Sequence, residues 1–146
     1  MKFLSQNFLI DGNIVRKIVK FAEVKKGDSI LEIGPGPGAL TEELLAQGAS
    51  VIAVEKDRKF AAALHRLQTA DQRLQIFEND VLKWNPTSHL NFKTKLIANL
   101  PYNITTPILT HFLPQRKFFQ SLTVMVQREV GERVIAKPGS KAYGSL

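Results

Sequence analysis

The sequence predicts an α/β protein built on a mostly parallel sheet. Short apolar segments alternate along the chain with segments of helical periodicity, which is the order that βαβ units produce. Four of the predicted strands end in a polar or glycine-rich turn. Because the carboxyl ends of parallel strands share one edge of a sheet, we expect the functional site along that edge. The 146 residues, 44% of them hydrophobic, suffice for one domain with a sizeable core.

The amino-terminal helix is predicted from its cap and its apolar face. Asp11 stands where an N-cap residue accepts backbone N–H groups, and Ile14, Ile18 and Phe21 follow at helical spacing. Gly48 is placed to end the second helix in a left-handed conformation. The helices are expected at residues 11–23, 39–47, 58–68, 107–112 and 129–136. Short apolar runs predict the strands 29–33, 51–54, 74–77, 95–98 and 122–126.

Composition excludes several classes of protein. The chain has no cysteine, which excludes disulfides, cysteine–zinc sites and thiol catalysis. No apolar run approaches the ~18 residues of a membrane helix, and polar residues interrupt the start of any signal peptide. His65, His89 and His111 are scattered without the spacing of metal ligands. We therefore expect a cytoplasmic protein with neither a membrane segment nor a metal ion.

The charge of the chain points to a polyanionic partner. Twenty Lys and Arg residues against 13 Asp and Glu residues give a net charge of +7. Residues 74–146 carry +5 of this charge, so this half is the expected contact surface for nucleic acid. Phosphate contact and a merely solvated face remain alternatives for each of its basic residues: Arg116, Lys117, Arg128, Arg133, Lys137 and Lys141.

A glycine-rich turn follows the first predicted strand. In Glu32-Ile-Gly34-Pro-Gly36-Pro-Gly38 the glycines let the backbone approach a ligand, and the next helix presents its N-terminus. The G-x-G-x-G spacing differs from the G-x-G-x-x-G of nicotinamide dinucleotide sites and disfavours a dehydrogenase. Glu55 ends the second strand and is placed to accept both ribose hydroxyls of a nucleoside. The alternatives are a structural turn and a solvated strand-end acid.

Two further segments carry chemistry for an adenine and an amine. Asp80, after the third strand, is placed to accept from an adenine amino group or to cap the following turn. In Asn99-Leu-Pro-Tyr102, the amide oxygen and the carbonyl before proline offer two acceptors to an exocyclic amine. Such acceptors favour the pyramidal amine that attacks a methyl sulfonium in line, and Tyr102 offers a face for stacking. A structural turn with a core tyrosine is the alternative.

Together these motifs resemble the ribosomal RNA adenine N6-dimethyltransferase family. The Asn-Leu-Pro-Tyr form favours its housekeeping KsgA-type branch over the Erm branch, which more often has Asn-Ile-Pro-Tyr. The family's fold is a Rossmann-like S-adenosylmethionine-dependent methyltransferase fold. The segments that carry the resemblance are 6–9, 30–41, Glu55, 79–81, 99–102, 126–130 and 136–146.

The resemblance implies a site and a reaction. S-adenosylmethionine would contact Asn7, Leu9, Gly34, Glu55 and Asp80. The implied reaction is two successive methyl transfers to each of two adjacent adenosines near the 3′ end of small-subunit ribosomal RNA. The RNA would be free or part of a pre-30S particle.

The resemblance also assigns the two residues nearest the reacting amine. Asn99 would sit between the cofactor and the target amine, and Tyr102 would stack on the target adenine. The alternatives are an Erm-type methyltransferase of large-subunit RNA and an RNA-binding assembly factor that needs no catalysis.

Two departures from the family pattern qualify this expectation. Ser5 stands where the family has glycine, and the chain ends at Leu146, before the family's last strands, its second stacking aromatic and its carboxy-terminal helical domain. We expect residues 1–146 to form an incomplete methyltransferase domain that keeps a cofactor pocket but is weak or inactive. We expect a monomer for the enzyme, but the exposed sheet edge of the truncated domain predicts self-association.

Overall fold

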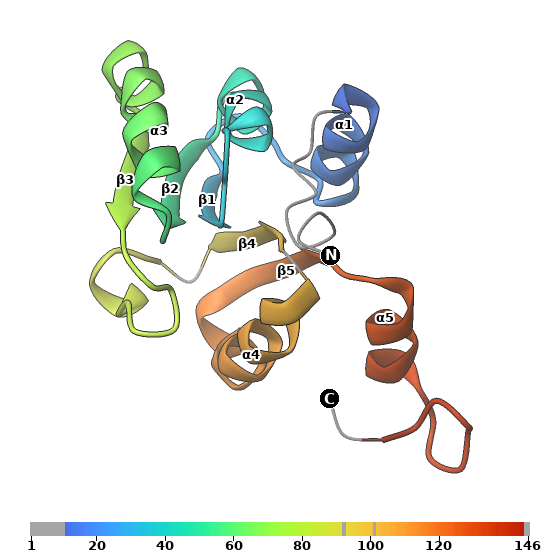
Figure 1. The fold of residues 1–146 in the computed structure, drawn as a ribbon. Coiled ribbons are helices and arrows are strands. Elements are labelled where there is room, and N and C mark those ends of the chain that lie inside the picture. Colours follow the sequence, from blue (N-terminus) through green and yellow to red (C-terminus); the bar gives the residue numbers. More distant parts are fainter. Residues whose placement is uncertain (1–10, 92, 101, 145–146) are drawn as a thin grey trace.

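The fold is a five-stranded, wholly parallel sheet with helices on both faces (Figure 1). It is seen in a computed structural model that describes residues 11–91, 93–100 and 102–144. The strand order is β3-β2-β1-β4-β5, which confirms the predicted parallel α/β sheet. The strands are β1 (Ser29–Ile33), β2 (Ser50–Glu55), β3 (Leu74–Glu78), β4 (Thr94–Asn99) and β5 (Phe119–Met125).

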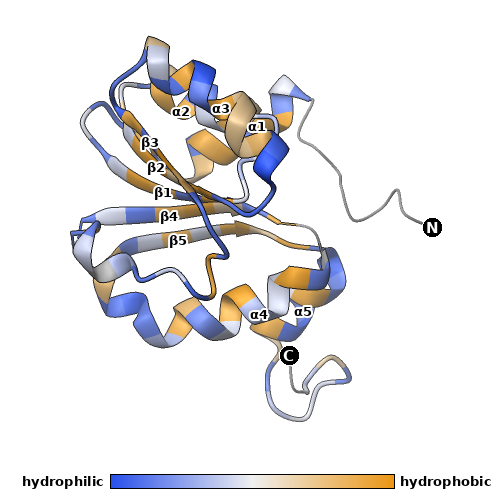
Figure 2. Ribbon diagram, turned by 60° about the vertical axis from the view of Figure 1, so that its left-hand side comes forward, coloured by the Kyte–Doolittle hydropathy of each residue, from blue (hydrophilic) through white to orange (hydrophobic). Residues whose placement is uncertain are grey.

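The helices divide between the two faces of the sheet. Figure 2 shows α1, α2 and α3 on one face and α4 and α5 on the other. The helices are α1 (Gly12–Phe21), α2 (Ala39–Ala46), α3 (Arg58–Ala70), α4 (Tyr102–Phe112) and α5 (Arg128–Ile135), with the 3₁₀ turns η1 (Pro86–Ser88) and η2 (Leu113–Phe118). None of the helices in the described ranges is long and apolar enough to cross a membrane.

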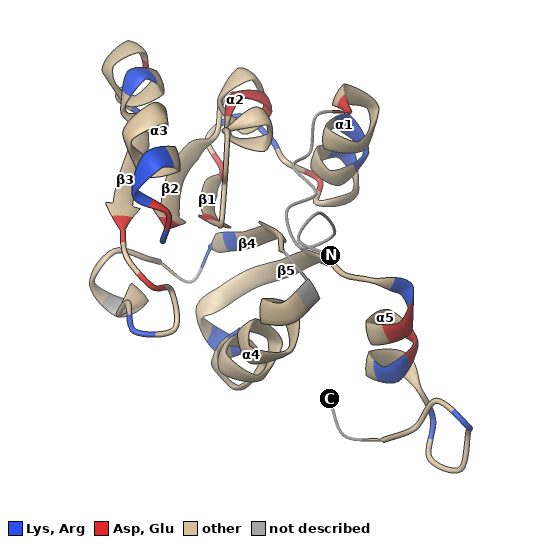
Figure 3. Ribbon diagram, viewed as in Figure 1, with Lys and Arg blue, Asp and Glu red and all other residues tan. Residues whose placement is uncertain are grey.

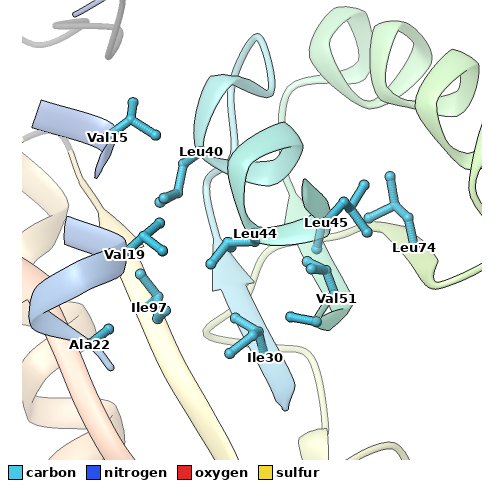
Figure 4. Close-up of a cluster of buried hydrophobic side chains, with 12 residues drawn as sticks. Val15, Val19, Ala22, Ile30, Leu40, Leu44, Leu45, Val51, Leu74 and Ile97 are labelled. Carbon is cyan, nitrogen blue, oxygen red and sulfur yellow. The ribbon is translucent and has the colours of Figure 1, made fainter. Parts of the chain in front are cut away.

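Alternation along the strands produces two separate cores. In β1, Ile30 packs under α1 and α2, whereas its neighbour Leu31 packs toward α4. Figure 4 shows the first core, where Val19 of α1 and Leu44 of α2 meet Ile30. The second core includes Phe112 of α4, whose ring meets that of Phe119 edge-on with centroids 5.8 Å apart. The sheet is thus buried on both faces, as parallel sheets require.

Polar contacts stabilise both ends of α1. Asp11 caps its start by accepting a hydrogen bond from the N–H of Asn13 at 2.8 Å, as predicted. At its other end, the buried ammonium of Lys95 in β4 donates to the carbonyls of Ala22 at 3.3 Å and Glu23 at 2.7 Å. The same ammonium pairs with the carboxylate of Asp28 at 2.9 Å. All its donors are therefore used inside the fold.

Two elements differ from the sequence prediction. The helix expected at 107–112 begins at Tyr102, so Pro107 lies inside α4 rather than at its start. Pro107 cannot donate to the carbonyl of Asn103, but the helix continues through it because Ile108 and Phe112 pack into the second core. The last strand, expected at 122–126, begins at Phe119, whose side chain is buried against β4 and α4. Tertiary packing decides both boundaries.

The strand order places a crevice beside β1. From β1 the chain adds β2 and then β3 on one side, and it then crosses over to add β4 and β5 on the other side. Helices that follow β1 and β4 consequently leave the sheet on opposite faces, and their first turns separate at the carboxyl edge (Figure 2). Open parallel sheets bind ligands in the crevice at such a switch point.

Candidate functional site

A cavity of about 400 Å³ lies at the carboxyl edge of the sheet. All five strand ends line it, through Gly34 after β1, Glu55 of β2, Asp80 after β3, Asn99 of β4 and Gln127 after β5. Four of these five residues are site residues that the sequence predicts. Its volume lies within the range of small-molecule sites. The predicted site residues Asn7 and Leu9 lie outside the described residues.

The glycine-rich turn forms one wall of the cavity. The backbone φ angles of Gly34, Gly36 and Gly38 are +64°, +55° and +97°. Residues other than glycine rarely adopt this left-handed region. At Gly38 a Cβ atom would stand 2.8 Å from Leu64 Cδ2 of α3, so this position also lacks room. The N–H of Gly34 donates to the carbonyl of Val54 at 3.0 Å and ties the turn to β2. The turn therefore brings bare backbone to the cavity.

Glu55 is a buried part of this wall rather than a solvated acid. Its side chain is 7% exposed, Oε2 accepts from the N–H of Gly36 at 3.0 Å, and Oε1 accepts from the N–H of Asp57 at 2.8 Å. Each carboxylate oxygen has a further lone pair for another donor. Glu55 thus orients the glycine turn and retains acceptors for a pair of ligand hydroxyls. The interpretation as a solvated strand-end acid is wrong.

Asp80 caps a turn, as one of the two interpretations from sequence predicts, and it also lines the cavity. Its Oδ1 accepts from the N–H of Leu82 at 3.0 Å, and its Oδ2 pairs with the ammonium of Lys56 at 3.2 Å. The backbone hydrogen bond from Leu82, followed by that from Lys56, holds the pKa of the Asp80 carboxyl below its usual range. Asp80 is therefore a carboxylate at neutral pH, suited to accept from an amino group.

Glu32 is the cavity residue that the sequence analysis missed as a site residue. It is 1% exposed, and Oε2 accepts from the hydroxyl of Thr41 in α2 at 2.7 Å. Its Oε1 is buried and has no hydrogen-bond partner among the described residues. Burial raises the pKa of Glu32 to about 8, and the charge of Glu55 acts in the same direction. One acid within the otherwise apolar run 30–33 was the clue in the sequence.

Asn99 lines the cavity from β4, which lies on the other side of β1 from the strands that carry Glu55 and Asp80. Asn99 is the last residue of β4, and its side chain is half-buried. Its amide makes no hydrogen bond within the described part of the chain. Tyr102 is the first residue of α4, but its side chain lies outside the described part of the structure, so the predicted stacking on a base stays a prediction. Pro101 also lies outside the described residues. The amide of Asn99 therefore remains free to bind a ligand from the cavity.

Three exposed apolar side chains form an apolar rim of the cavity. Leu82 follows β3, Ile104 lies in α4 and Met125 ends β5, and they are 38%, 37% and 38% exposed. Exposed apolar side chains that line a cavity favour a flat, apolar ligand surface. No periodic pattern in the sequence marks this rim, because its members come from segments far apart in the chain.

The histidines and the basic residues of the second half of the chain are not part of the cavity lining. His65 contacts Gln68, His89 stacks on Trp84 with ring centroids 5.5 Å apart, and His111 packs against Phe112. The described residues hold no group of three or more side chains that could bind a metal. Basic residues lie on α5 and in the loop after it, where Arg128 pairs with Glu132 at 2.8 Å (Figure 3).

Comparison with known sequences identifies the family to which the chain belongs. A family model described as "Ribosomal RNA adenine dimethylase" matches residues 1–146. The "Ribosomal RNA small subunit methyltransferase A" of Protochlamydia amoebophila is 52% identical over 99% of this chain and 53% of its own length. The protein of that name from Moorella thermoacetica is 47% identical over 99% of this chain and 54% of its own length. The chain spans about half the length of the curated relatives it matches.

Solved structures share the fold. A dimethyladenosine transferase from Plasmodium falciparum aligns with a TM-score of 0.78 and 30% identity, covering 92% of this chain and 48% of that chain. The 23S rRNA methyltransferase ErmE aligns with a TM-score of 0.76 and 27% identity, covering 87% of this chain and 50% of that chain. These likenesses confirm the predicted Rossmann-like fold.

Proposed function

Because this chain belongs to the ribosomal RNA adenine dimethylase family, we propose that its protein methylates N6 of adenines in small-subunit ribosomal RNA. The methyl donor is S-adenosylmethionine. The observation that carries the proposal is the single cavity that Gly34, Glu55, Asp80 and Asn99 line together. The relatives named for the small subunit are 52% and 47% identical to the chain, whereas ErmE is 27% identical.

The residues of the cavity fit the donor. The carboxylate of Glu55 suits the ribose hydroxyls, and the carboxylate of Asp80 suits the adenine amino group. The left-handed glycine turn lets the amino-acid part approach the backbone at the start of α2. When bound, S-adenosylmethionine supplies a methyl group on a positively charged sulfur.

The part of the cavity beside Asn99 suits the acceptor adenine. The side-chain oxygen of Asn99 would accept from the target amine and direct its lone pair toward the methyl group. The carbonyl of Leu100, which precedes Pro101, would supply the second acceptor. The apolar rim of Leu82, Ile104 and Met125 would exclude water around the base. No strong general base is then needed beside the amine.

The finer features of the function follow the family resemblance. We infer that the protein dimethylates two adjacent adenosines near the 3′ end of the RNA, in free RNA or a pre-30S particle. The basic residues of the second half, which carries +5 of the net charge, are the inferred phosphate contacts. The same function implies a cytoplasmic enzyme that acts as a monomer.

The experiment is a methylation assay with radiolabelled S-adenosylmethionine on unmethylated small-subunit and large-subunit particles. The chain is assayed alone and joined to the carboxy-terminal half of its Protochlamydia relative. We expect label in small-subunit RNA from the joined protein and little from the chain alone. Asn99→Ala should lower the rate about 100-fold, and Asn103→Ala, exposed on α4 beside the site, should not. Label in large-subunit RNA, or an active Asn99→Ala protein, would contradict the proposal.

A further inference from the structure

Glu32 stands in a setting that disfavours a charged carboxylate. It lies on the central strand β1, between Ala53 of β2 and Ile97 of β4, both of which are wholly buried. Its only hydrogen-bonding partner among the described residues is the Thr41 hydroxyl, which donates to Oε2. The other oxygen is buried without a partner. An ion so placed costs several kcal/mol more than the neutral acid.

The surrounding charges do not compensate this carboxyl. Glu55 on β2 adds a second negative charge to the same cavity. Lys95 on β4 is committed to Asp28 and to the carbonyls at the end of α1. Arg16 of α1 is exposed and donates to Asn13. Across the cavity, Lys56 pairs with Asp80.

Helix α2, which covers Glu32, also brings no positive charge. Its charged residues are Glu42, which is exposed, and Glu43, which accepts from Gln47 at 2.9 Å. Burial raises the pKa of Glu32 to about 8, although the hydrogen bond from Thr41 lowers it, and the charge of Glu55 adds a smaller upward shift. The ligand-free cavity therefore contains Glu32, mostly protonated at neutral pH, together with the carboxylates of Glu55 and Asp80.

We propose that Glu32 is a proton-linked positioning residue, uncharged in the ligand-free cavity and deprotonated when a positively charged nucleoside fills it. This inference rests on the proposed function, which supplies S-adenosylmethionine as that nucleoside. The O–H bond of Glu32 breaks, its proton passes to the buffer, and the carboxylate formed balances the ligand's positive charge. Thr41 keeps the side chain in place by donating to Oε2 in both states.

The linkage gives binding a defined pH dependence. Below pH ~8 the protein must lose the proton of Glu32 before the charge pair forms, so affinity rises with pH by up to about tenfold per unit. The neighbouring carboxyl Asp80 does not titrate in this range, because its pKa is lowered. Glu32→Gln, which stays neutral and keeps an acceptor for Thr41, should bind with no such dependence.

The test is calorimetric titration with S-adenosylmethionine at neutral pH, in buffers of different ionisation enthalpy. The wild-type chain should release close to one proton more than Glu32→Gln, and the matched control Glu43→Gln should behave as wild type. Equal proton release by wild type and Glu32→Gln would overturn the inference and leave the proposed function standing. Absence of binding by the folded wild-type chain would overturn both.

A second measurement, on the wild-type chain alone, tests the inference if the Glu32→Gln variant does not fold. Wild-type protein carrying [¹³C]carboxyl-labelled glutamate is titrated by NMR without and with S-adenosylmethionine. We expect one carboxyl resonance that is protonated at neutral pH in the free chain and ionised in the complex. A set of glutamate resonances that are all ionised at neutral pH in the free chain would overturn the inference.

Discussion

The central strands β1 and β2 are covered far more completely than the β5 end of the sheet. Four of the five residues of β1 and four of the six residues of β2 are buried, and α2 buries four residues. In β5 only Phe119 is buried, and α5 buries none of its residues. The well-covered strands lead to Gly34 and Glu55, two residues of the proposed cofactor site. The difference separates a packed centre of the sheet from an end whose surface is left open.

The largest expected effect tests this difference directly. Leu44→Ala removes a wholly buried side chain from α2 and should lower the free energy of unfolding by about 3 kcal/mol. Ile135→Ala on α5, where the side chain is 79% exposed, should cost less than about 0.5 kcal/mol. Urea unfolding followed by circular dichroism measures both. Equal costs would show that α5 is packed and that the two regions do not differ.

The glycine turn gives the next largest effect. Gly38→Ala adds a Cβ at φ +97°, 2.8 Å from Leu64 Cδ2, and should cost about 2 kcal/mol from strain and crowding together. Gly139→Ala also has a left-handed φ, of +85°, but its Cβ would meet nothing within 4 Å. It should cost about 1 kcal/mol. If Gly38→Ala cost no more than Gly139→Ala in the same unfolding assay, the packing around the turn would be looser than described.

The pH dependence of stability isolates Glu32. Its pKa is about 8 in the folded chain against an ordinary 4.5, so the folded state holds the proton more tightly. Its contribution to the free energy of unfolding is therefore complete below the ordinary pKa of 4.5. The contribution is lost as the pH rises toward the pKa of about 8 in the folded chain, by on the order of 1 kcal/mol per pH unit. Urea unfolding at several pH values should show this decline in wild type. The decline should disappear in Glu32→Gln, and a decline of the same slope there would assign it to another group.

The smallest expected effect concerns the open end. β5 pairs only with β4 among the described strands, contains no charged residue and is followed by exposed apolar residues on α5, including Ile135. Such an edge favours weak self-association at high concentration, as the sequence predicts. Thr123→Lys should reduce it in sedimentation equilibrium, because a charged edge resists pairing, whereas Thr110→Lys on the exposed side of α4 should not. A monomer at all concentrations would contradict this prediction.

Much of the fold was predictable because its determinants are local or periodic. Alternation of apolar residues specifies buried parallel strands, and such strands bring their ends to one edge, so Gly34, Glu55, Asp80 and Asn99 were predicted to meet. The family resemblance was confirmed by the comparisons. Other features depend on packing between distant segments.

These features could not be predicted from sequence patterns. The start of α4 five residues before Pro107 depends on the packing of Ile108 and Phe112 in the second core. The unpartnered oxygen of Glu32 depends on how α2 closes over β1, which no spacing in the sequence encodes. The apolar rim likewise combines residues from three distant segments of the chain.

The most direct test of the central claim is calorimetric titration of this chain with S-adenosylmethionine. The cavity beside the packed strands β1 and β2 should bind it saturably, and Glu55→Ala should weaken binding about 100-fold, because it removes the proposed hydroxyl acceptors and the contact with Gly36 that holds the glycine turn. Glu78→Ala, the exposed residue paired with Glu55 at the end of β3, should bind as wild type. Failure of the folded chain to bind, or equal binding by Glu55→Ala, would contradict the account.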